Sequence, residues 1–376
     1  MRASDATSPR GGGTTAAGLG VTPPGAEFEI WRNGLRRRAL EHVADFVDTR
    51  CLPQLERTGV DITGDVLVQF VDGGKCLRST FMYLGWLCGA DPDDAALRAA
   101  SGLELLHAFA LLQDDVMDDS PLRRGRPAAH VQFGQWHLER GLSGSPDRFG
   151  AALSVLLSDL CLVWAEQMMR ESGVGHEALH RAWPHYDEMR IELAVGQCAD
   201  VANDAGADPD LEAVLDVARR KSGNYTVRRP LEIGAAMAGC DHLIGALGHY
   251  GSALGEAFQM RDDILGVFGS PAVTGKPAGG DLAERKATSV VVAAQRMADS
   301  AIRRQFAELM AAEDLTSEDI SHWRTLIVAT GAAEWIEELI AERVDIATAA
   351  ICDDRIDDWA QSALADMAAV CTLRIT

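Results

Sequence analysis

LLHAFALLQDDVMDD, at residues 105–119, is an apolar run that ends in four carboxylates. Residues four apart share one face of an α-helix, so Asp114 pairs with Asp118, and Asp115 with Asp119. Mg²⁺ prefers oxygen ligands and is usually held by one or two carboxylates together with substrate phosphates. The alternative is a solvated acidic helix end, but acidic side chains there oppose the helix dipole. The segment therefore predicts a helix that ends in a metal and phosphate site.

The segment LGEAFQMRDDILG, at residues 254–266, repeats this arrangement, with Asp262 and Asp263 after an apolar run. A single Asp-Asp pair is a weak signal. Two such pairs, each on an apolar helix and each followed by a loop with basic residues, are typical of metal sites between facing helices of a bundle.

The whole chain favours one large domain, because its 376 residues are 47% hydrophobic and contain no long polar linker. The formal charge of −21, from 56 acidic and 35 basic residues, disfavours nucleic acid or an anionic membrane as a partner. The eight cysteines have no metal-binding spacing, and they indicate reduced core residues of a cytoplasmic protein.

From residue 27 onward, apolar residues recur with helical spacing, which predicts an all-α single-domain bundle of ten or more helices around a central cavity. Residues 1–26 are rich in Gly, Thr, Ala and Pro, and we expect a disordered leader before a domain at 27–376. The apolar window 149–164 contains Asp159 and is too short to span a membrane, so it predicts a core or subunit-interface helix and no integral membrane segment. The expected helices, several of them broken by short turns, cover approximately 28–56, 65–70, 78–89, 93–117, 127–139, 148–171, 176–203, 209–222, 225–237, 240–267, 285–311, 316–329 and 332–372.

Six short motifs follow one another along the chain. They are GGKCLR at 73–78, DDVMD at 114–118 with RRG at 123–125, GQ at 196–197, KSGNYT at 221–226, FQMRDD at 258–263 and TGK at 274–276. These motifs and their order resemble those of the trans-isoprenyl diphosphate synthases, the all-α family that condenses isopentenyl diphosphate with an allylic diphosphate. The resemblance implies an isoprenoid-synthase type of fold, a homodimer and three Mg²⁺ ions in each active site.

The chemistry of this family needs metals, cations and apolar walls together. Loss of diphosphate from an allylic carbon leaves negative charge on the leaving group and a carbocation that water must not reach. The resemblance implies that Asp114 and Asp118 bind two Mg²⁺ ions and Asp262 a third, all bridging to the allylic diphosphate. Asp115 and Asp263 would act on the metal ions mainly indirectly, through bound waters or through contacts with the residues that bind the metal.

The resemblance also assigns the basic and polar residues. It places Arg123, Lys221 and Lys276 on the allylic diphosphate, and Lys75, Arg78, His107 and Arg124 on the isopentenyl diphosphate, which binds without metal. It places Ser222, Tyr225 and Gln259 beside the carbocation. The alternatives are a solvated basic loop for Arg123 and Arg124, core packing for His107, and helix packing for Ser222, Tyr225 and Gln259.

Product length depends on what blocks the apolar channel beneath the first acidic motif. Phe109 lies five residues before Asp114, about 7.5 Å along the helix axis. One aromatic here, followed by the small Ala110, resembles the pattern of enzymes that form geranylgeranyl diphosphate (C20). A farnesyl or longer product is the alternative, and a plain core role for Phe109 is compatible with either.

The sequence departs from the family pattern at three positions. Gly266 stands where many relatives have a third Asp, so metal binding at the second motif depends on Asp262 and Asp263. Cys76 and Ser79 stand where Arg and Pro are frequent, which puts isopentenyl diphosphate affinity in question. Asp281 and Lys286 fit the distal pair of the family.

Two other classes of protein share part of this pattern. A class I terpene cyclase also uses an aspartate-rich motif, but it needs no isopentenyl pocket and normally carries an NSE-type second site. A non-catalytic partner subunit of a heteromeric synthase would be expected to have lost the acidic motifs that this chain retains.

Overall fold

The computed structural model describes residues 24–204, 210–269 and 279–373, and the all-α prediction is confirmed. Within these residues the one sheet is a short antiparallel hairpin in which Arg123 pairs with Arg126. The elements are α1 (Ala26–Phe46), α2 (Leu52–Leu55), α3 (Thr63–Val71), α4 (Leu77–Leu87), α5 (Asp94–Met117), β1 (Leu122–Arg123), β2 (Arg126–Pro127), α6 (Ala129–Glu139), α7 (Pro146–Arg170), α8 (His176–Asp204), α9 (Leu211–Ala218), α10 (Arg229–Ala238), α11 (Ile244–Phe268), α13 (Gly280–Ala283), α14 (Ser289–Met297), α15 (Ser300–Ala311), α16 (Ser317–Ala329), α17 (Ala332–Ile351) and α18 (Asp358–Thr372).

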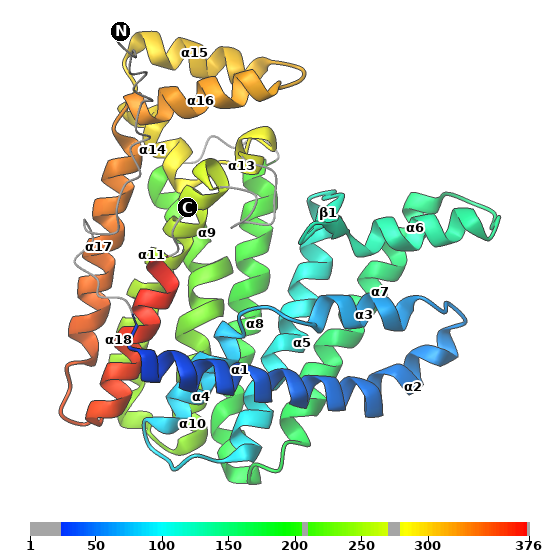
Figure 1. Cartoon of the computed structure of the whole chain (residues 1–376), viewed down its shortest axis with the longest axis vertical. Helices are drawn as coiled ribbons and strands as arrows, with labels where there is room; N and C mark the ends of the chain where they lie inside the picture. Colours follow the sequence, from blue (N-terminus) through cyan, green and yellow to red (C-terminus); the bar gives the residue numbers. More distant parts are fainter. Residues whose placement is uncertain (1–23, 205–209, 270–278, 374–376) are drawn as a thin grey trace, which may run out of the picture.

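The body of the molecule is a set of long helices that run in roughly the same direction, with α1 crossing them and the α15–α16 pair at one end (Figure 1). Helix α5 packs against α7, and α11 packs against α17. Each acidic motif therefore lies at the end of a helix that another long helix supports.

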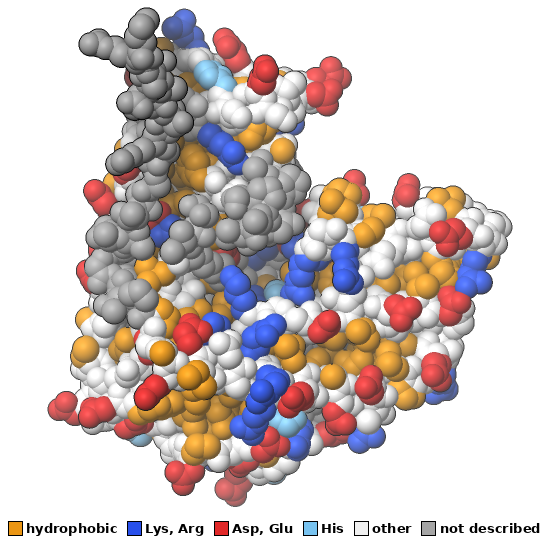
Figure 2. Space-filling model, in the orientation of Figure 1, with side chains coloured by type: hydrophobic (Ala, Val, Ile, Leu, Met, Phe, Trp, Pro, Cys, Tyr) orange, Lys and Arg blue, Asp and Glu red, His pale blue; other side chains and the backbone are white. Residues whose placement is uncertain are grey.

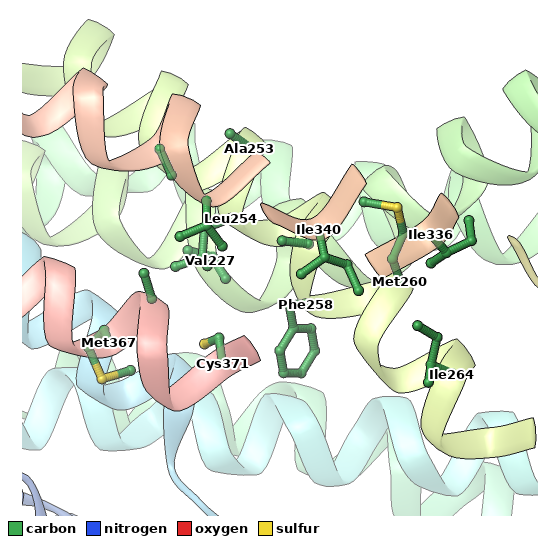
Figure 3. Close-up of a cluster of buried hydrophobic side chains, with 14 of the residues drawn as sticks. Val227, Ala253, Leu254, Phe258, Met260, Ile264, Ile336, Ile340, Met367 and Cys371 are labelled. Carbon is green, nitrogen blue, oxygen red and sulfur yellow. The ribbon is translucent and has the colours of Figure 1, made fainter. Parts of the chain in front are cut away.

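Two apolar clusters hold these helix pairs together. One surrounds α11 and α17, and Figure 3 shows Leu254 and Phe258 of α11 beside Ile340 of α17. The other surrounds α5 and α7, and it includes Leu105 and Leu112. The apolar half of each motif is thus buried, which fixes the direction of the carboxylates at its end.

Some predicted boundaries were wrong. The helix expected at 285–311 is two helices, because the chain turns to an extended conformation at Ala298 and Asp299 caps α15. The helix expected at 332–372 is also two, and Asp357 caps the second. Conversely, no break separates 209–222 from 225–237, because a π-helical segment, Arg219–Arg228, joins α9 to α10.

Two helices, α5 and α7, are long and apolar enough to cross a membrane by length and composition. The core helix of a soluble protein passes the same test, and these two helices pack against each other. Six of the eight cysteines are buried, as expected, while Cys198 and Cys352 are exposed. The leader expected at 1–26 falls almost entirely outside the described residues.

Candidate functional site

The end of α5 presents two carboxylates to lysines from distant parts of the chain. The Lys221 Nζ lies 3.0 Å from Asp114 Oδ1, and the Lys286 Nζ lies 3.1 Å from Asp118 Oδ2. Asp119 follows in a left-handed conformation with a fully exposed side chain. The sequence offered two overlapping pairs of aspartates, and the pair that faces lysines is Asp114 with Asp118.

Lys221 is held between α5 and α8. Its ammonium also donates to Asp200, a residue that the sequence did not single out. Burial lowers the pKa of Lys221, but Asp114 and Asp200 outweigh it, so the pKa is raised and the ammonium stays charged. A Cβ on Gly196 would lie 2.8 Å from the backbone nitrogen of Lys221, so this glycine permits the close approach of the two backbones. Asp200 lies four residues after Gly196 on α8, and residues four apart share a helix face, so the sequence could have indicated Asp200 as a neighbour of Lys221.

Asp115 supports the site from behind. Its side chain is fully buried, and Arg123 Nε donates to Oδ1 at 2.7 Å. Burial raises the pKa of Asp115, although the charge of Arg123 opposes the rise. The same guanidinium lies 3.5 Å from Asp114 Oδ2. Arg123 therefore links the hairpin to both neighbouring carboxylates.

At the second acidic end, Asp263 is turned inward. It accepts hydrogen bonds from the Ser289 nitrogen and hydroxyl, at 2.9 and 2.6 Å, and from Gln259 Nε2 at 2.7 Å. Burial raises the pKa of Asp263 to about 6 despite these donors. Asp262 lies on the adjacent, half-buried face of α11. The Gln259 amide nitrogen is thus engaged with Asp263, whereas the resemblance implied a place beside the carbocation.

A basic pocket of about 190 Å³ lies beside the hairpin, lined by Arg123, Arg124 and Arg126 with α3 and Leu111. Figure 2 shows Lys and Arg side chains gathered on this face, although the chain as a whole is acidic. Arg124 Nη1 donates to the Asp72 carbonyl at 3.2 Å. Arg36, which the sequence did not indicate, donates to the Gly74 carbonyl at 2.6 Å.

His107 faces these arginines from α5. Burial, followed by the charges of Arg78, Arg124 and Arg123, lowers its pKa well below the usual value, so the imidazole is neutral. Its Nδ1 is buried without a hydrogen-bond partner among the described residues. A neutral imidazole with an open nitrogen can donate to or accept from a bound ligand.

Arg78 and Tyr225 form a stacked pair deeper in the molecule. The guanidinium lies 4.2 Å from the ring centroid and donates to Thr226 Oγ1 at 3.0 Å. The Tyr225 hydroxyl donates to the Leu106 carbonyl at 3.2 Å. Tyr225 therefore positions Arg78 and the helix before the acidic motif, and its hydroxyl is already engaged.

The remaining predicted residues lie as follows. Lys75 is exposed, Ser222 is half-buried in the π-helical segment, and Lys276 falls outside the described residues. Phe109 and Ala110 pack, partly buried, against the cluster around α5 and α7.

The two departures in the first glycine-rich motif are both buried. Cys76 has a left-handed conformation with φ 49°, and Ser79 donates to Glu104 at 2.6 Å. Position 79 thus anchors the buried Glu104 carboxylate of α5 to α4.

The carboxylates fit a hard metal that needs phosphate as a co-ligand. Within the described ranges, no three His, Cys, Asp or Glu side chains gather as a complete metal site. The available donors, Asp114, Asp118 and Asp262, offer only oxygen atoms. Because Mg²⁺ usually takes one or two carboxylates plus substrate phosphates, this donor set fits Mg²⁺ bound together with a diphosphate.

Comparison with known proteins gives consistent matches. The model of a family described as polyprenyl synthetase matches residues 61–327. A geranylfarnesyl diphosphate synthase from Aeropyrum pernix is 34% identical, over 70% of this chain and 79% of its own. A geranylgeranyl diphosphate synthase from Mycobacterium tuberculosis is 32% identical, over 74% and 75%. A crystal structure of geranylgeranyl pyrophosphate synthase from Corynebacterium glutamicum, complexed with isoprenyl diphosphate and magnesium, superimposes with a TM-score of 0.85 at 35% identity, covering 91% of this chain and 99% of that one.

Proposed function

Because the chain belongs to the polyprenyl synthetase family and is therefore a prenyltransferase, we propose that it elongates allylic diphosphates to geranylgeranyl diphosphate. Isopentenyl diphosphate is the second substrate. The observation that carries the proposal is the pairing of Asp114 and Asp118 with Lys221 and Lys286 at the end of one apolar helix. Synthases for C20 and C25 products both occur among the relatives, so the product length rests on residues of this chain.

The acidic ends and the lysines would hold the allylic diphosphate. Enzymes of this family generally use Mg²⁺, which supplies charge stabilisation for the departing diphosphate when it is bound. In our proposal Asp114, Asp118 and Asp262 hold three Mg²⁺ ions. Lys221, Arg123 and Lys276 neutralise the same diphosphate, and the raised pKa of Lys221 keeps one of these charges in place.

The isopentenyl diphosphate would be held at the basic pocket, by Arg124 from its lining and by Lys75, Arg78 and His107 from outside that lining. Arginine offers a planar fork that matches phosphate oxygens, so Arg78 and Arg124 suit this role, with Lys75 as a mobile charge. His107 is neutral and adds a hydrogen bond without further charge. No side-chain general base is required, because the released diphosphate can accept the proton.

The direct test supplies purified protein with isopentenyl diphosphate and each allylic primer in turn, with products sized by mass spectrometry. We expect elongation that stops at C20. Absence of any elongation, with a cyclised hydrocarbon in its place, would support a class I terpene cyclase and overturn the proposal.

We predict that Phe109→Ala shifts the products beyond C20 by one or more five-carbon units. The ring lies on α5 about 7.5 Å below Asp114, so its removal deepens the channel along which the chain grows. Ala110→Phe is the matched control with the opposite sign, and it should shorten the products. An unchanged product distribution in Phe109→Ala would exclude this residue as the floor.

We also propose a homodimer formed through α7 and α8. Leu156 and Val163 are exposed along α7, at 58% and 55%, and Ile191 is exposed on α8 at 62%. An ion pair between Glu166 and Arg190 joins the two helices beside Val163 and Ile191. Exposed apolar rows on neighbouring helices mark an interaction surface.

A cytoplasmic location is proposed as well, because the cysteines are scattered along the chain without metal-binding spacing and suit a reducing compartment.

Introducing a charge into this surface is expected to separate the subunits. We predict that wild-type protein has twice the mass of one chain in light scattering, and that Leu156→Glu with Val163→Glu has the mass of one chain. Val328→Glu, at an apolar residue exposed on α16, is the control and should keep the wild-type mass. A wild-type mass equal to one chain would contradict the dimer.

A further inference from the structure

One arginine of α1 differs from the other three in its partners. Arg36 is half-buried and forms no ion pair with a carboxylate among the residues that the structure describes. Its Nε donates instead to the Gly74 carbonyl at 2.6 Å. The other three each pair with an acidic side chain: Arg32 with Glu29 at 2.9 Å, Arg37 with Glu41 at 3.8 Å and Arg38 with Asp94 at 2.7 Å.

The loop that Arg36 contacts has an unusual backbone. Gly73, Gly74 and Cys76 all have left-handed conformations, with φ of 80°, 74° and 49°. Glycine adopts this conformation readily, but a cysteine there is strained and needs support from its surroundings. The hydrogen bond from Arg36 provides such support, because it fixes the carbonyl of Gly74 to α1.

A second arginine reaches the same loop from the hairpin. Arg124 Nη1 donates to the Asp72 carbonyl at 3.2 Å, and its Nη2 would lie 3.5 Å from a Cβ at Gly74. The charges of Arg36 and Arg124 both act on the buried Cys76 thiol and favour a lower pKa, although burial outweighs them. Two guanidinium groups from distant parts of the chain therefore meet at this loop.

Stability alone does not explain this pair of cations. Like charges brought together are unfavourable, and the chain has 56 acidic residues from which partners could have been drawn. Arg124, like Arg36, forms no ion pair with a carboxylate within the described ranges, and the Asp72 side chain beside them is exposed and pairs with neither. Guanidinium groups match phosphate oxygens in geometry and charge, so the pair indicates a phosphorylated ligand.

We propose that Arg36 is a further binding residue for the isopentenyl diphosphate. Its Nε holds the loop at Gly74, and its two Nη nitrogens, which have no hydrogen-bond partner among the described residues, bind the diphosphate beside Arg124. This inference rests on the proposed function and extends the isopentenyl site to α1. Because α1 precedes the first of the six motifs, the resemblance assigns it no role.

Three variants of Arg36 separate binding of the diphosphate from support of the loop. Arg36→Gln keeps a donor for the Gly74 carbonyl and removes the charge, Arg36→Lys keeps the charge, and Arg36→Met removes both. We expect the KM for isopentenyl diphosphate to rise about 10-fold in Arg36→Gln and Arg36→Met, with Arg36→Lys nearer to wild type. The kcat and the KM for the allylic primer should change little, because the allylic diphosphate is held by other residues.

The matched control is Arg37→Gln, which removes the same charge from the next residue of α1. The Arg37 side chain is 74% exposed, and we expect the wild-type KM for both substrates. If Arg36 serves only to hold the loop, Arg36→Gln and Arg36→Lys will behave alike, because both side chains can donate to the carbonyl. That result, or a rise of the same size in Arg37→Gln, would overturn the inference.

Titration calorimetry with isopentenyl diphosphate and a metal chelator measures the same site without turnover. We expect Arg36→Gln to bind about 10-fold more weakly than wild type. Wild-type protein that neither elongates a primer nor binds isopentenyl diphosphate would overturn the proposed function, and this inference with it. Wild-type protein that elongates, with an unchanged KM in Arg36→Gln, would overturn only the role of Arg36. Circular dichroism of each variant checks that the helices are intact.

Discussion

Replacing Asp114 with asparagine is expected to lower kcat/KM about 1,000-fold, which corresponds to about 4 kcal/mol of transition-state stabilisation. The substitution keeps the size of the side chain and removes its charge. In the proposed reaction that charge holds a metal ion on the departing diphosphate, and its effect is greatest when the diphosphate leaves. Lys221 and Arg123, which lie 3.0 and 3.5 Å from the Asp114 oxygens, would also lose the carboxylate between them.

Steady-state kinetics with an allylic primer and isopentenyl diphosphate check this prediction, and most of the loss should fall on kcat. Asp119→Asn is the matched control from the same acidic cluster. Its side chain is fully exposed, and its left-handed conformation suits asparagine, so activity should stay near that of wild type. Equal losses in the two variants, or less than a tenfold loss in Asp114→Asn, would contradict the metal assignment.

Much of the fold could be predicted from the sequence because its signals are local. Apolar residues at helical spacing define α5 and α11, and the carboxylates at their ends follow directly from that spacing. The helix breaks at Ala298 and before Asp357 were missed because neither position carries glycine or proline. The extended conformation at Ala298 is followed directly by Asp299, whose capping role becomes visible once the break is known.

The partners of the acidic residues could be predicted only in part. The family motif identified Lys221, but its second partner, Asp200, comes from another helix and belongs to no acidic run. Lys286 reaches Asp118 across 168 residues, and the Asp281 carboxylate fills the space at Gly266 only after α13 packs on α16. The absence of a side chain at Gly266 therefore leaves the space that Asp281 occupies.

Replacing Arg229 with methionine is expected to cost about 3 kcal/mol of unfolding free energy, because the change removes one buried cation from the buried carboxylate of Glu232 and from the half-buried carboxylate of Glu192. Arg229 is buried and donates to both oxygens of Glu192, at 2.9 and 2.6 Å, and to Glu232 at 2.7 Å. Burial pushes the pKa of Glu232 upward, but His185, Arg228 and Arg229 outweigh it, so the net pKa is lowered. The network ties α8 to α10.

Urea denaturation at one fixed protein concentration measures the loss, since association would make stability depend on concentration. Arg50→Met is the matched control: its ion pair with Glu171 is exposed at 3.2 Å, and its removal should cost less than about 1 kcal/mol.

The pH dependence of the Arg229 effect gives a second, independent test. A lowered carboxyl pKa contributes stability above the unfolded pKa, and this contribution is lost as pH falls through the folded value. Because the variant lacks one of the cations that lower the pKa of Glu232, its deficit relative to wild type should shrink as the pH falls from 7.5 towards 4. A deficit that is constant over this range would show that the loss arises from packing of the side chain and not from its charge.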